Sequence, residues 1–508
     1  MALENPIIEL DSISKAFGPI QANKNISLKI KAGTIHGIVG ENGAGKSTLM
    51  SVLYGFYKAD QGSIKIKGKK VSITDSQAAI EQGIGMVFQH FKLVENFSVL
   101  ENIILGAEDG HLIGHSLDVA RDTLSKLAKE YELNVDPDSI IETISVGMQQ
   151  RVEILKALYR KAEILILDEP TGVLTPAEAE HLFRILRNLK AEGKTIILIT
   201  HKLKEIMNAT DTVSVMRQGE MTSTMRTKET NPEQLAELMV GRKVLLRVEK
   251  KLPDRGKTVL ACSNVNYVDS KGVDRLKDIS FEIHQGEILG IAGVAGNGQS
   301  ELLEVLAGIT RADGQLTINS RTFSLDSKDT NPLNRRQLGI SHVPEDRQKL
   351  GLIMEYYAWE NMALGYHNNL KYLSNAVFMN NSRLRLETDQ RIKHYDIRPS
   401  NGSLLAKSFS GGNQQKIVLA REIEQNPELL IVGQPTRGVD IGAIEFIHKR
   451  LIQLRDSGKA VLLISVELDE ILSLSDRILV MFDGKIMGER EAKNTNEKEL
   501  GLLMAGVG

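Results

Sequence analysis

The sequence predicts an α/β protein built from two tandem domains, each organised around a mostly parallel β-sheet. Helical stretches alternate with short apolar runs rich in β-branched residues, and such runs are typical of parallel strands buried on both faces. The motifs of the first half recur in the second half, and a charged segment separates the two sets. Together these observations predict two copies of one α/β fold. The clearest strand runs of the first half are IHGIVG at Ile35, IGMVF at Ile84, ILILD at Ile164 and TIILIT at Thr195.

A helix is predicted to begin shortly after the run at Ile164. The sequence Thr175-Pro176-Ala177-Glu178 combines an N-cap residue, a proline at the first helical position and a glutamate that can complete a capping box. Thr175 is therefore interpreted as a helix cap.

The spacing of the repeated motifs indicates a duplication. Gln299 follows Lys46 by 299 − 46 = 253 residues, and Glu345 follows Gln89 by 345 − 89 = 256. The offset is 265 for three later pairs: Ser145 with Ser410, Glu169 with Gln434, and His201 with Val466. So long a period indicates tandem domains rather than a solenoid. We predict domains at residues 1–245 and 258–508, joined by a linker at 246–257 that is charged and contains Pro253 and Gly256.

The composition is that of an ordinary globular protein. The 508 residues are 42% hydrophobic and 25% charged, and 63 Lys and Arg against 65 Asp and Glu leave no basic excess that would favour a nucleic-acid partner. The single cysteine, Cys262, excludes a disulfide framework. The N-terminus lacks the features of a signal peptide, and the longest apolar runs are too short to span a bilayer. We expect a cytosolic chain with no transmembrane segment of its own.

The first half contains a phosphate-binding loop. GENGAGKST follows a predicted strand and opens a predicted helix, which is the context that this motif requires. Glycines let backbone N–H groups approach phosphates, Lys46 can reach the β and γ oxygens, and the Ser47 hydroxyl can bind Mg²⁺. A glycine-rich turn that only caps a helix is the alternative, but the lysine argues against it. The predicted ATP-binding residues of the loop are Gly40, Glu41, Asn42, Gly43, Ala44, Gly45, Lys46, Ser47 and Thr48.

Two adjacent carboxylates end the buried run ILILDEP. Asp168 is placed to hold Mg²⁺, and Glu169 can orient and deprotonate an attacking water. Two solvated charges at a strand end are the alternative interpretation. The continuous apolar strand and the upstream phosphate loop favour the catalytic one.

At these motifs the sequence resembles the ATP-binding cassette (ABC) family, over nearly the whole chain. Five motifs follow the family's order: Phe17, Gln89, the signature Ser145–Gln149, Asp168-Glu169, and His201. The resemblance implies that Phe17 stacks on adenine, that Gln89 senses γ-phosphate and metal, and that His201 holds γ-phosphate and water. Alone, Phe17 would be interpreted as core and His201 as structural. The expected catalytic residues are Glu169, His201, Gln89 and Lys46, and the expected metal ligands are Ser47, Gln89 and Asp168. Each domain is expected to have a phosphate-loop α/β core, an antiparallel β lobe and a helical subdomain.

The second half has lost the residues that carry the chemistry. Gln299 replaces the lysine, and Gly433 and Gln434 replace the carboxylate pair. Glu345, in place of Gln89, adds negative charge where phosphates would lie, and Val466 replaces His201. We expect no hydrolysis at this loop, although nucleotide can still bind through backbone amides. The predicted residues of this degenerate site are Gly293, Gly296, Gly298, Gln299 and Ser300, with Ser145 and Gly147 from the first half.

The signature of the second half is nevertheless complete, as Phe409–Lys416, and Asp440 is the aspartate that Thr175 replaces in the first half. In ABC proteins two cassettes enclose ATP head to tail, so each site joins one phosphate loop to the other signature. The resemblance therefore implies an intrachain sandwich with one intact site. The expected contributions of the second half to that site are Ser410, Gly411, Gly412 and Gln414.

Three motifs indicate a particular group within the family. VPEDR at Val343, FSGGNQQK at Phe409 and QPTRGVD at Gln434 resemble the ATPases of ribose, galactose and nucleoside importers. The segments Gly83–Gly106 and Ser145–Leu158 favour the nucleoside branch, which is linked to a basic membrane lipoprotein, and monosaccharide import is the alternative. A soluble two-cassette ATPase acting on the ribosome is less favoured, because those relatives keep both catalytic glutamates and have a long charged linker.

The resemblance also implies cofactors and partners. The cofactors would be ATP and Mg²⁺. The partners would be two integral-membrane permease subunits, which insert coupling helices near Gln89 and Glu345, and an extracytoplasmic substrate-binding lipoprotein. The chain would then lie at the cytoplasmic face of the cell membrane.

Overall fold

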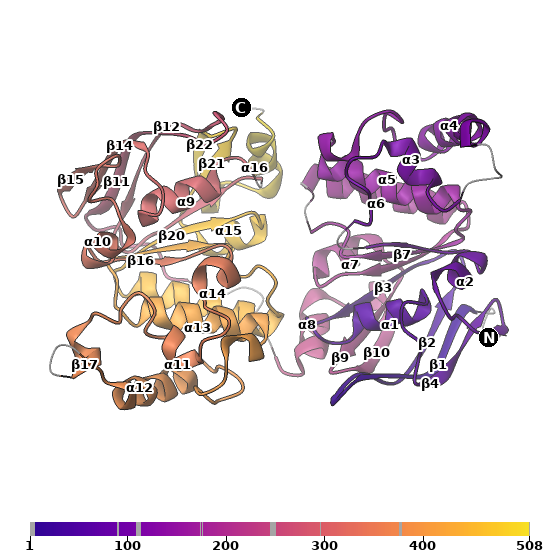
Figure 1. The fold of residues 1–508 in the computed structure, drawn as a ribbon, viewed down its shortest axis with the longest axis horizontal. Coiled ribbons are helices and arrows are strands. Elements are labelled where there is room, and N and C mark those ends of the chain that lie inside the picture. Colours follow the sequence, from indigo (N-terminus) through magenta and orange to yellow (C-terminus); the bar gives the residue numbers. More distant parts are fainter. Residues whose placement is uncertain are drawn as a thin grey trace. The chain divides into compact units, whose positions relative to one another are not determined.

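The computed structural model describes residues 6–88, 91–107, 113–172, 174, 176–243, 250–294, 296–374 and 378–506. The chain divides into two compact units, unit 1 at Met1–Val244 and unit 2 at Leu245–Gly508, and strands alternate with helices in both (Figure 1). Two predicted functional residues, Gln89 and Thr175, lie outside the described residues.

Unit 1 contains a six-stranded sheet in the order β10-β9-β3-β8-β7-β6. Its neighbouring strands pair in parallel except for β9 and β10. The four predicted strand runs form β3, β6, β7 and β8, and every residue in them is buried, as expected for the centre of a parallel sheet. The strands are β3 (Ile35–Gly40), β6 (Ile84–Val87), β7 (Ile164–Asp168), β8 (Thr195–Ile199), β9 (Thr212–Arg217) and β10 (Glu220–Arg226).

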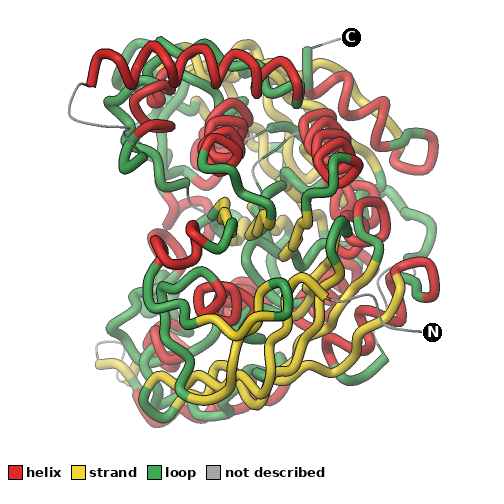
Figure 2. The backbone as a smooth tube through the Cα atoms, turned by 90° about the vertical axis from the view of Figure 1, so that its right-hand side faces the viewer, coloured by secondary structure: helices red, strands yellow, loops and turns green. Residues whose placement is uncertain are grey.

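An antiparallel lobe completes unit 1. Its four strands have the order β2-β1-β4-β5. Figure 1 shows the labels β1, β2 and β4 beside the labelled N-terminus, and Figure 2 draws all strands in yellow. Buried residues of this lobe, such as Ile8 and Ile26, share one core cluster with Leu49 and Met50 of α1. The lobe consists of β1 (Pro6–Phe17), β2 (Ile20–Lys31), β4 (Gln61–Ile66) and β5 (Lys69–Val71).

The helices of unit 1 pack against the central sheet. α1 contacts β2 and β3, whereas α5, α6 and α7 contact β6, β8 and β3 respectively. α6 begins at Pro176, as predicted. The helices are α1 (Lys46–Leu53), α2 (Ser76–Glu81), α3 (Val99–Ile104), α4 (Ile113–Glu130), α5 (Val146–Tyr159), α6 (Pro176–Ala191), α7 (Leu203–Ala209) and α8 (Pro232–Val240).

The two larger sheets of unit 2 repeat the strand order of the two sheets of unit 1. Its six-stranded sheet has the order β22-β21-β13-β20-β19-β16, and its antiparallel lobe has the order β12-β11-β14-β15. The repeat confirms the predicted fold of two tandem α/β domains, each with an antiparallel lobe. The strands are β11 (Thr258–Val268), β12 (Asp274–His284), β13 (Ile288–Ala292), β14 (Asp313–Ile318), β15 (Arg321–Ser324), β16 (Ile340–Val343), β19 (Leu429–Gly433), β20 (Ala460–Ser465), β21 (Arg477–Phe482) and β22 (Lys485–Glu491).

The core of unit 2 lies on both faces of its sheet. On one face, α9 packs in a cluster with the antiparallel lobe, and on the other, α13, α14 and α15 share a second cluster with the same strands. β17 (Leu373–Ser374) pairs antiparallel with β18 (Phe378–Met379). The helices are α9 (Gln299–Ala307), α10 (Pro332–Gln337), α11 (Ala358–Asn361), α12 (Asn381–His394), α13 (Gly411–Ile423), α14 (Ile441–Asp456), α15 (Leu468–Leu474) and α16 (Glu497–Met504).

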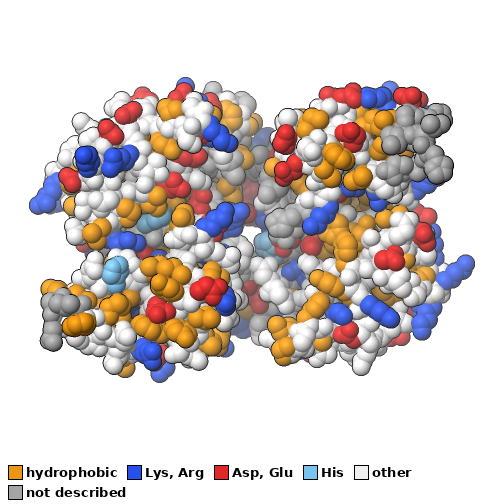
Figure 3. Space-filling model, viewed as in Figure 1, with side chains coloured by type: hydrophobic (Ala, Val, Ile, Leu, Met, Phe, Trp, Pro, Cys, Tyr) orange, Lys and Arg blue, Asp and Glu red, His pale blue; other side chains and the backbone are white. Residues whose placement is uncertain are grey.

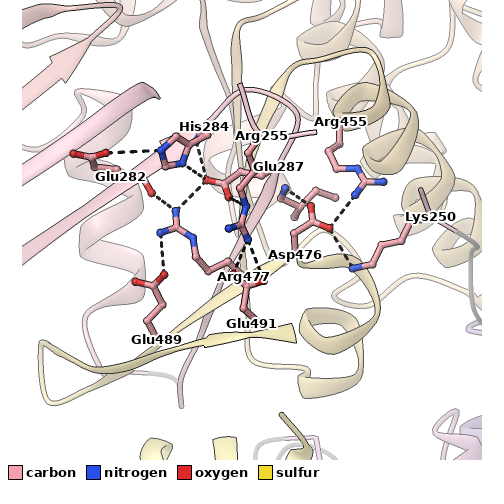
Figure 4. A network of polar contacts seen from close by, with 11 residues as sticks. Lys250, Arg255, Glu282, His284, Glu287, Arg455, Asp476, Arg477, Glu489 and Glu491 are labelled. Carbon is pink, nitrogen blue, oxygen red and sulfur yellow. Dashed lines mark hydrogen bonds and ion pairs between the residues drawn. The ribbon is translucent and has the colours of Figure 1, made fainter. Parts of the chain in front are cut away.

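A buried ion-pair network fixes the residues that precede β11 to the rest of unit 2 (Figure 4). The buried carboxylate of Asp476 accepts a hydrogen bond from Arg455 Nη1 at 2.9 Å, and Lys250 Nζ lies 3.7 Å from it. The side chain of Glu287 is fully buried and lies 3.1 Å from Arg255 Nε. Two cations of the charged segment therefore neutralise carboxylates in the core of unit 2.

The surface carries charges of both signs. On the face shown in Figure 3, blue and red side chains are interspersed, in keeping with the nearly balanced counts of basic and acidic residues. Among the described residues, none of the helices combines the length and the apolar character needed to cross a lipid bilayer.

Candidate active site

The phosphate loop of unit 1 connects β3 to α1 and requires glycine at its tightest point. Gly43 and Gly45 have φ angles of 82° and 96°, in the left-handed region that glycine favours. A Cβ atom on Gly45 would lie 2.3 Å from the carbonyl oxygen of Ala22. The loop thus leads directly into a helix N-terminus, whose backbone N–H groups are free to face an anion.

Lys46, the first residue of α1, is folded back over this loop. Its ammonium group donates to the carbonyl oxygens of Gly40 at 2.7 Å and Glu41 at 3.0 Å. Burial lowers the pKa of Lys46, while the charges of Glu169 and Asp168 oppose that shift. The two hydrogen bonds therefore hold the Lys46 amino group against the backbone of the loop.

Asp168 ends β7 and is brought beside Ser47. Burial raises the pKa of Asp168, and the hydrogen bond from the Ser47 hydroxyl opposes this shift. The Oδ1 atom of Asp168 is buried and has no hydrogen-bond partner among the described residues. A buried, unpartnered carboxylate oxygen next to a hydroxyl is a suitable ligand pair for Mg²⁺, so two of the predicted metal ligands lie together.

Glu169 and His201 form the next pair along this sheet edge. His201 Nδ1 lies 2.9 Å from Glu169 Oε1. Burial alone would raise the pKa of Glu169, but the hydrogen bond and charge of His201, together with Lys46 and Lys202, lower it overall. Glu169 has a φ of 48°, and its N–H donates to the carbonyl of Ile199 at 2.8 Å, which fixes this strained turn. The pair can therefore present an ionised carboxylate to a water molecule.

Phe17 lies at the end of β1 with 41% of its surface exposed. Its ring packs edge-to-face against Tyr57 at a centroid distance of 5.0 Å, and Lys15 Nζ lies 5.5 Å from its centroid. An exposed ring held in this way is available for stacking. The sequence motifs did not reveal Tyr57 and Lys15, because neither belongs to a recognisable pattern.

Unit 2 repeats the backbone of this site with different side chains. Gly296 and Gly298 have φ angles of 92° and 98° before α9 begins at Gln299. Gln434 repeats the left-handed turn of Glu169, with a φ of 46°, and its Oε1 accepts a 3.3 Å hydrogen bond from the backbone N–H of Val466. An amide at this position cannot accept a proton from water at neutral pH.

The two signature serines differ in their local contacts. Ser145 caps α5, because its hydroxyl accepts from the N–H of Met148 at 3.3 Å. Ser410 precedes α13 without such a bond, and its hydroxyl accepts instead from the Asn413 side chain at 2.8 Å. The Ser410 hydroxyl is therefore not used to cap its own helix.

The other signature residues lie at crowded positions. A Cβ on Gly147 would be 2.6 Å from Glu178 Oε1, and one on Gly411 would be 2.5 Å from a guanidinium nitrogen of Arg347. A Cβ on Gly412 would likewise lie too close to the Asp440 carboxylate. This carboxylate also caps α14, because it accepts a hydrogen bond from the N–H of Ala443 at 2.7 Å.

Gln414 shapes the turn before α13. It is buried, and its amide donates to the carbonyl oxygens of Ala406 and Phe409 at 3.2 and 3.0 Å. These two bonds fix the backbone on which Ser410 lies.

Comparison with known proteins agrees with this geometry. The family described as "ABC transporter" matches residues 23–172 and 276–437. The chain is 46% identical over 503 residues to the nucleoside import ATP-binding protein NupA of Lactococcus lactis, covering 98% of both chains. It is 47% identical to the guanosine import ATP-binding protein NupO of Bacillus subtilis, over 98% of this chain and 97% of that one. It is 41% identical to the glucose import ATP-binding protein TsgD13 of Haloferax volcanii, over 99% of this chain and 96% of that one. The chain therefore belongs to the ABC transporter family, as a two-cassette ATPase of the group that these import proteins represent.

Proposed function

We propose that this chain powers nucleoside import and hydrolyses ATP only at the phosphate loop of unit 1. The observation that carries the one-site assignment is that Lys46, Asp168, Glu169 and His201 meet at one sheet edge, whereas unit 2 has no base at the position of Glu169. Nucleoside import is favoured over monosaccharide import because the identity to NupA and NupO exceeds that to the glucose import protein.

The residues of unit 1 have distinct roles in this proposal. Ser47 and Asp168 would hold Mg²⁺, which neutralises phosphate charge when bound. The Lys46 ammonium lies where it can pair with the transferred phosphate, and Phe17 offers its exposed ring to the adenine. Glu169 accepts the proton of the attacking water, and His201 holds the Glu169 carboxylate in place.

We further propose that the two units enclose ATP head to tail, so that the signature of unit 2 completes the site of unit 1. An arginine at Ser410 would then obstruct the competent site, and an arginine at Ser145 would obstruct only the degenerate one. Ser410→Arg should reduce ATP turnover by about 100-fold, the scale of a misplaced substrate, while Ser145→Arg should retain most of it. Phosphate release by the two purified variants measures the difference, and a greater loss in Ser145→Arg would contradict the crossed pairing.

The proposed partners are two integral-membrane permease subunits and an extracytoplasmic substrate-binding lipoprotein, which would bring the chain to the cytoplasmic face of the membrane. Cells that lack the chain should lose uptake of labelled nucleosides and keep uptake of labelled ribose, galactose and glucose. Wild-type chain should restore uptake, and the matched Glu169→Gln variant should not. Loss of sugar uptake alone would support the monosaccharide alternative. Co-purification with ribosomes and without permeases would support the ribosomal one.

A further inference from the structure

The VPEDR motif orders a tight turn after β16, and none of the roles described above accounts for it. Glu345 of this motif packs against the neighbouring strand β19, where a Cβ atom on Gly433 would lie 2.6 Å from Glu345 Cγ. Asp346 follows, and its carboxylate accepts from two backbone N–H groups of the turn Arg347–Gly351, both at 3.0 Å. The motif therefore fixes the backbone from which the Arg347 side chain extends.

The guanidinium group of Arg347 bridges two carbonyl groups of the loop that follows Gln434. Its Nη1 donates to the carbonyl oxygen of Arg437 at 2.7 Å, and its Nη2 donates to that of Gly438 at 3.5 Å. The signature lies against the same group, because a Cβ atom on Gly411 would lie 2.5 Å from Nη2 and 3.0 Å from the carbonyl oxygen of Gly438. One side chain therefore joins VPEDR to QPTRGVD and FSGGNQQK, the three motifs that resemble those of importer ATPases.

The rest of the turn lies along the signature helix α13. Gln348 Nε2 donates to Gln414 Oε1 at 3.1 Å, so the amide nitrogen of Gln414 faces the backbone that precedes Ser410. At the end of the turn, the carbonyl oxygen of Gly351 accepts a 2.8 Å hydrogen bond from the buried guanidinium group of Arg421. The turn is thus attached to α13 near both ends of the helix.

Unit 1 has a different residue at the corresponding position. The offset that relates Gln89 to Glu345 gives Phe91 as the counterpart of Arg347, since 347 − 256 = 91. A phenyl ring carries no hydrogen-bond donor, so it cannot bridge two carbonyl oxygens. The guanidinium bridge therefore belongs to the unit whose signature motif is complete.

The segments that Arg347 joins are rich in glycine. Gly411 and Gly412 begin α13, and Gly438 has a φ of 65°, in the left-handed region. Glycine loses more conformational freedom than other residues when it is ordered, so such segments need external bonds to keep one geometry. A charged donor forms stronger hydrogen bonds than a neutral one, and a planar guanidinium group can serve two acceptors at once. Arg347 is thus suited to hold both segments.

We propose that Arg347 is a positioning residue for ATP hydrolysis, which holds the signature Ser410–Gln414 and the loop before Asp440 in one fixed arrangement. The inference rests on the proposed head-to-tail pairing, in which these two segments complete the site of unit 1. Arg347 contacts no nucleotide in this role and acts through the segments that it joins. Its loss should therefore slow the chemical step and leave the affinity of unit 1 for ATP almost unchanged.

Steady-state kinetics of the full-length chain separate these two effects. Arg347→Ala should lower kcat by about 10-fold to 100-fold, the upper value being the scale of a misplacement by about 1 Å, while KM for ATP changes little. Lys349→Ala is the matched control, because it removes a positive charge from an exposed position of the same turn and should keep the kcat of the wild type. Arg347→Lys keeps the charge but not the two-pronged guanidinium group, so its kcat should fall by less than that of Arg347→Ala.

Hydrogen exchange measures the positioning without turnover. In Arg347→Ala without nucleotide, the amides of residues 407–416 and 435–441 should exchange about tenfold faster, the scale for loss of one hydrogen bond to a charged group. Arg347→Lys should show a smaller increase at the same amides, so the test does not depend on how well the alanine variant folds. The amides of β13 and β20 should exchange as in the wild type, and Lys349→Ala should match the wild type throughout. Mass spectrometry of the peptic peptides gives these rates.

The outcomes distinguish the positioning role from the head-to-tail pairing. Exchange as in the wild type in both Arg347 variants would overturn the proposal, whatever their turnover. Equal losses of kcat in Arg347→Ala and Lys349→Ala would also overturn it, because charge and not the two hydrogen bonds would then decide. Faster exchange with the kcat of the wild type would overturn the role in hydrolysis if Ser410→Arg loses turnover. If Ser410→Arg also keeps its turnover, the pairing itself fails, and the exchange rates still show that Arg347 fixes the signature.

Discussion

Replacing Glu169 with glutamine is expected to reduce ATP turnover by about 10²–10⁴-fold, the range for loss of a general base, while leaving ATP binding intact. Glutamine keeps the shape of the side chain, and Lys46 and the loop amides that bind phosphate are unchanged. The lowered pKa of Glu169 means that the wild-type carboxylate is ionised at neutral pH, so the substitution removes the proposed base. Phosphate release measures turnover, and fluorescent ATP titration measures binding.

Gln434→Ala is the matched control at the corresponding position of unit 2. Because the amide of Gln434 cannot accept a proton, its removal should leave most of the turnover. A loss as large as that of Glu169→Gln would contradict one-site hydrolysis. Turnover close to that of the wild type in Glu169→Gln would contradict the choice of base.

Asp476→Ala is expected to destabilise unit 2 by about 3–5 kcal/mol, the usual cost of removing one partner from a buried ion pair. The side chains of Asp476 and Arg455 are 2% and 1% exposed, so little water can replace the lost carboxylate. The backbone N–H of Ile288, which donates to Asp476 Oδ2 at 2.9 Å, would also lose its acceptor. The substitution thus leaves both a buried guanidinium and a backbone amide without this partner.

The fluorescence of the single tryptophan reports this effect. Trp359 lies in α11 and is 7% exposed, so its emission follows the unfolding of unit 2 and not that of unit 1. In urea, Asp476→Ala should shift the tryptophan transition to markedly lower concentration. Asp483→Ala is the control, because Asp483 pairs with Lys277 while 69% exposed and should shift the transition little. Equal shifts in the two variants would show that the buried ion pair contributes no more to the stability of unit 2 than the exposed pair does.

The central strands could be predicted from sequence because burial on both faces leaves a continuous apolar run. β3, β7 and β8 are such runs, and each is buried throughout. The antiparallel lobes could be expected only through the family resemblance. In β1 the pairing register shifts between Leu10 and Ile13, next to Ser12 with its φ of 57°, and this irregularity breaks the alternation of period two that marks a half-buried strand.

The motifs likewise predict the chemical residues of the candidate site, since each lies in a loop or at a strand end of recognisable pattern. Contacts between residues of different motifs cannot be predicted in this way. For Glu345 the sequence predicts only an added negative charge, because its close approach to Gly433 depends on the packing of two neighbouring strands. The sequence predicts only a charged linker around Lys250 and Arg255, because the carboxylates they pair with, Asp476 and Glu287, lie elsewhere in the sequence.

Those two cations determine where a recombinant second half could be cut from the chain. A fragment that began at β11 would contain every described strand of unit 2, yet the fully buried Glu287 would lose Arg255 and keep Arg477, 3.0 Å away, as a partner. Asp476 would lose Lys250 in the same cut. A fragment that begins upstream of Lys250 keeps both neutralising charges. For recombinant fragments, the edge of this unit is therefore set by charge balance and not by its first strand.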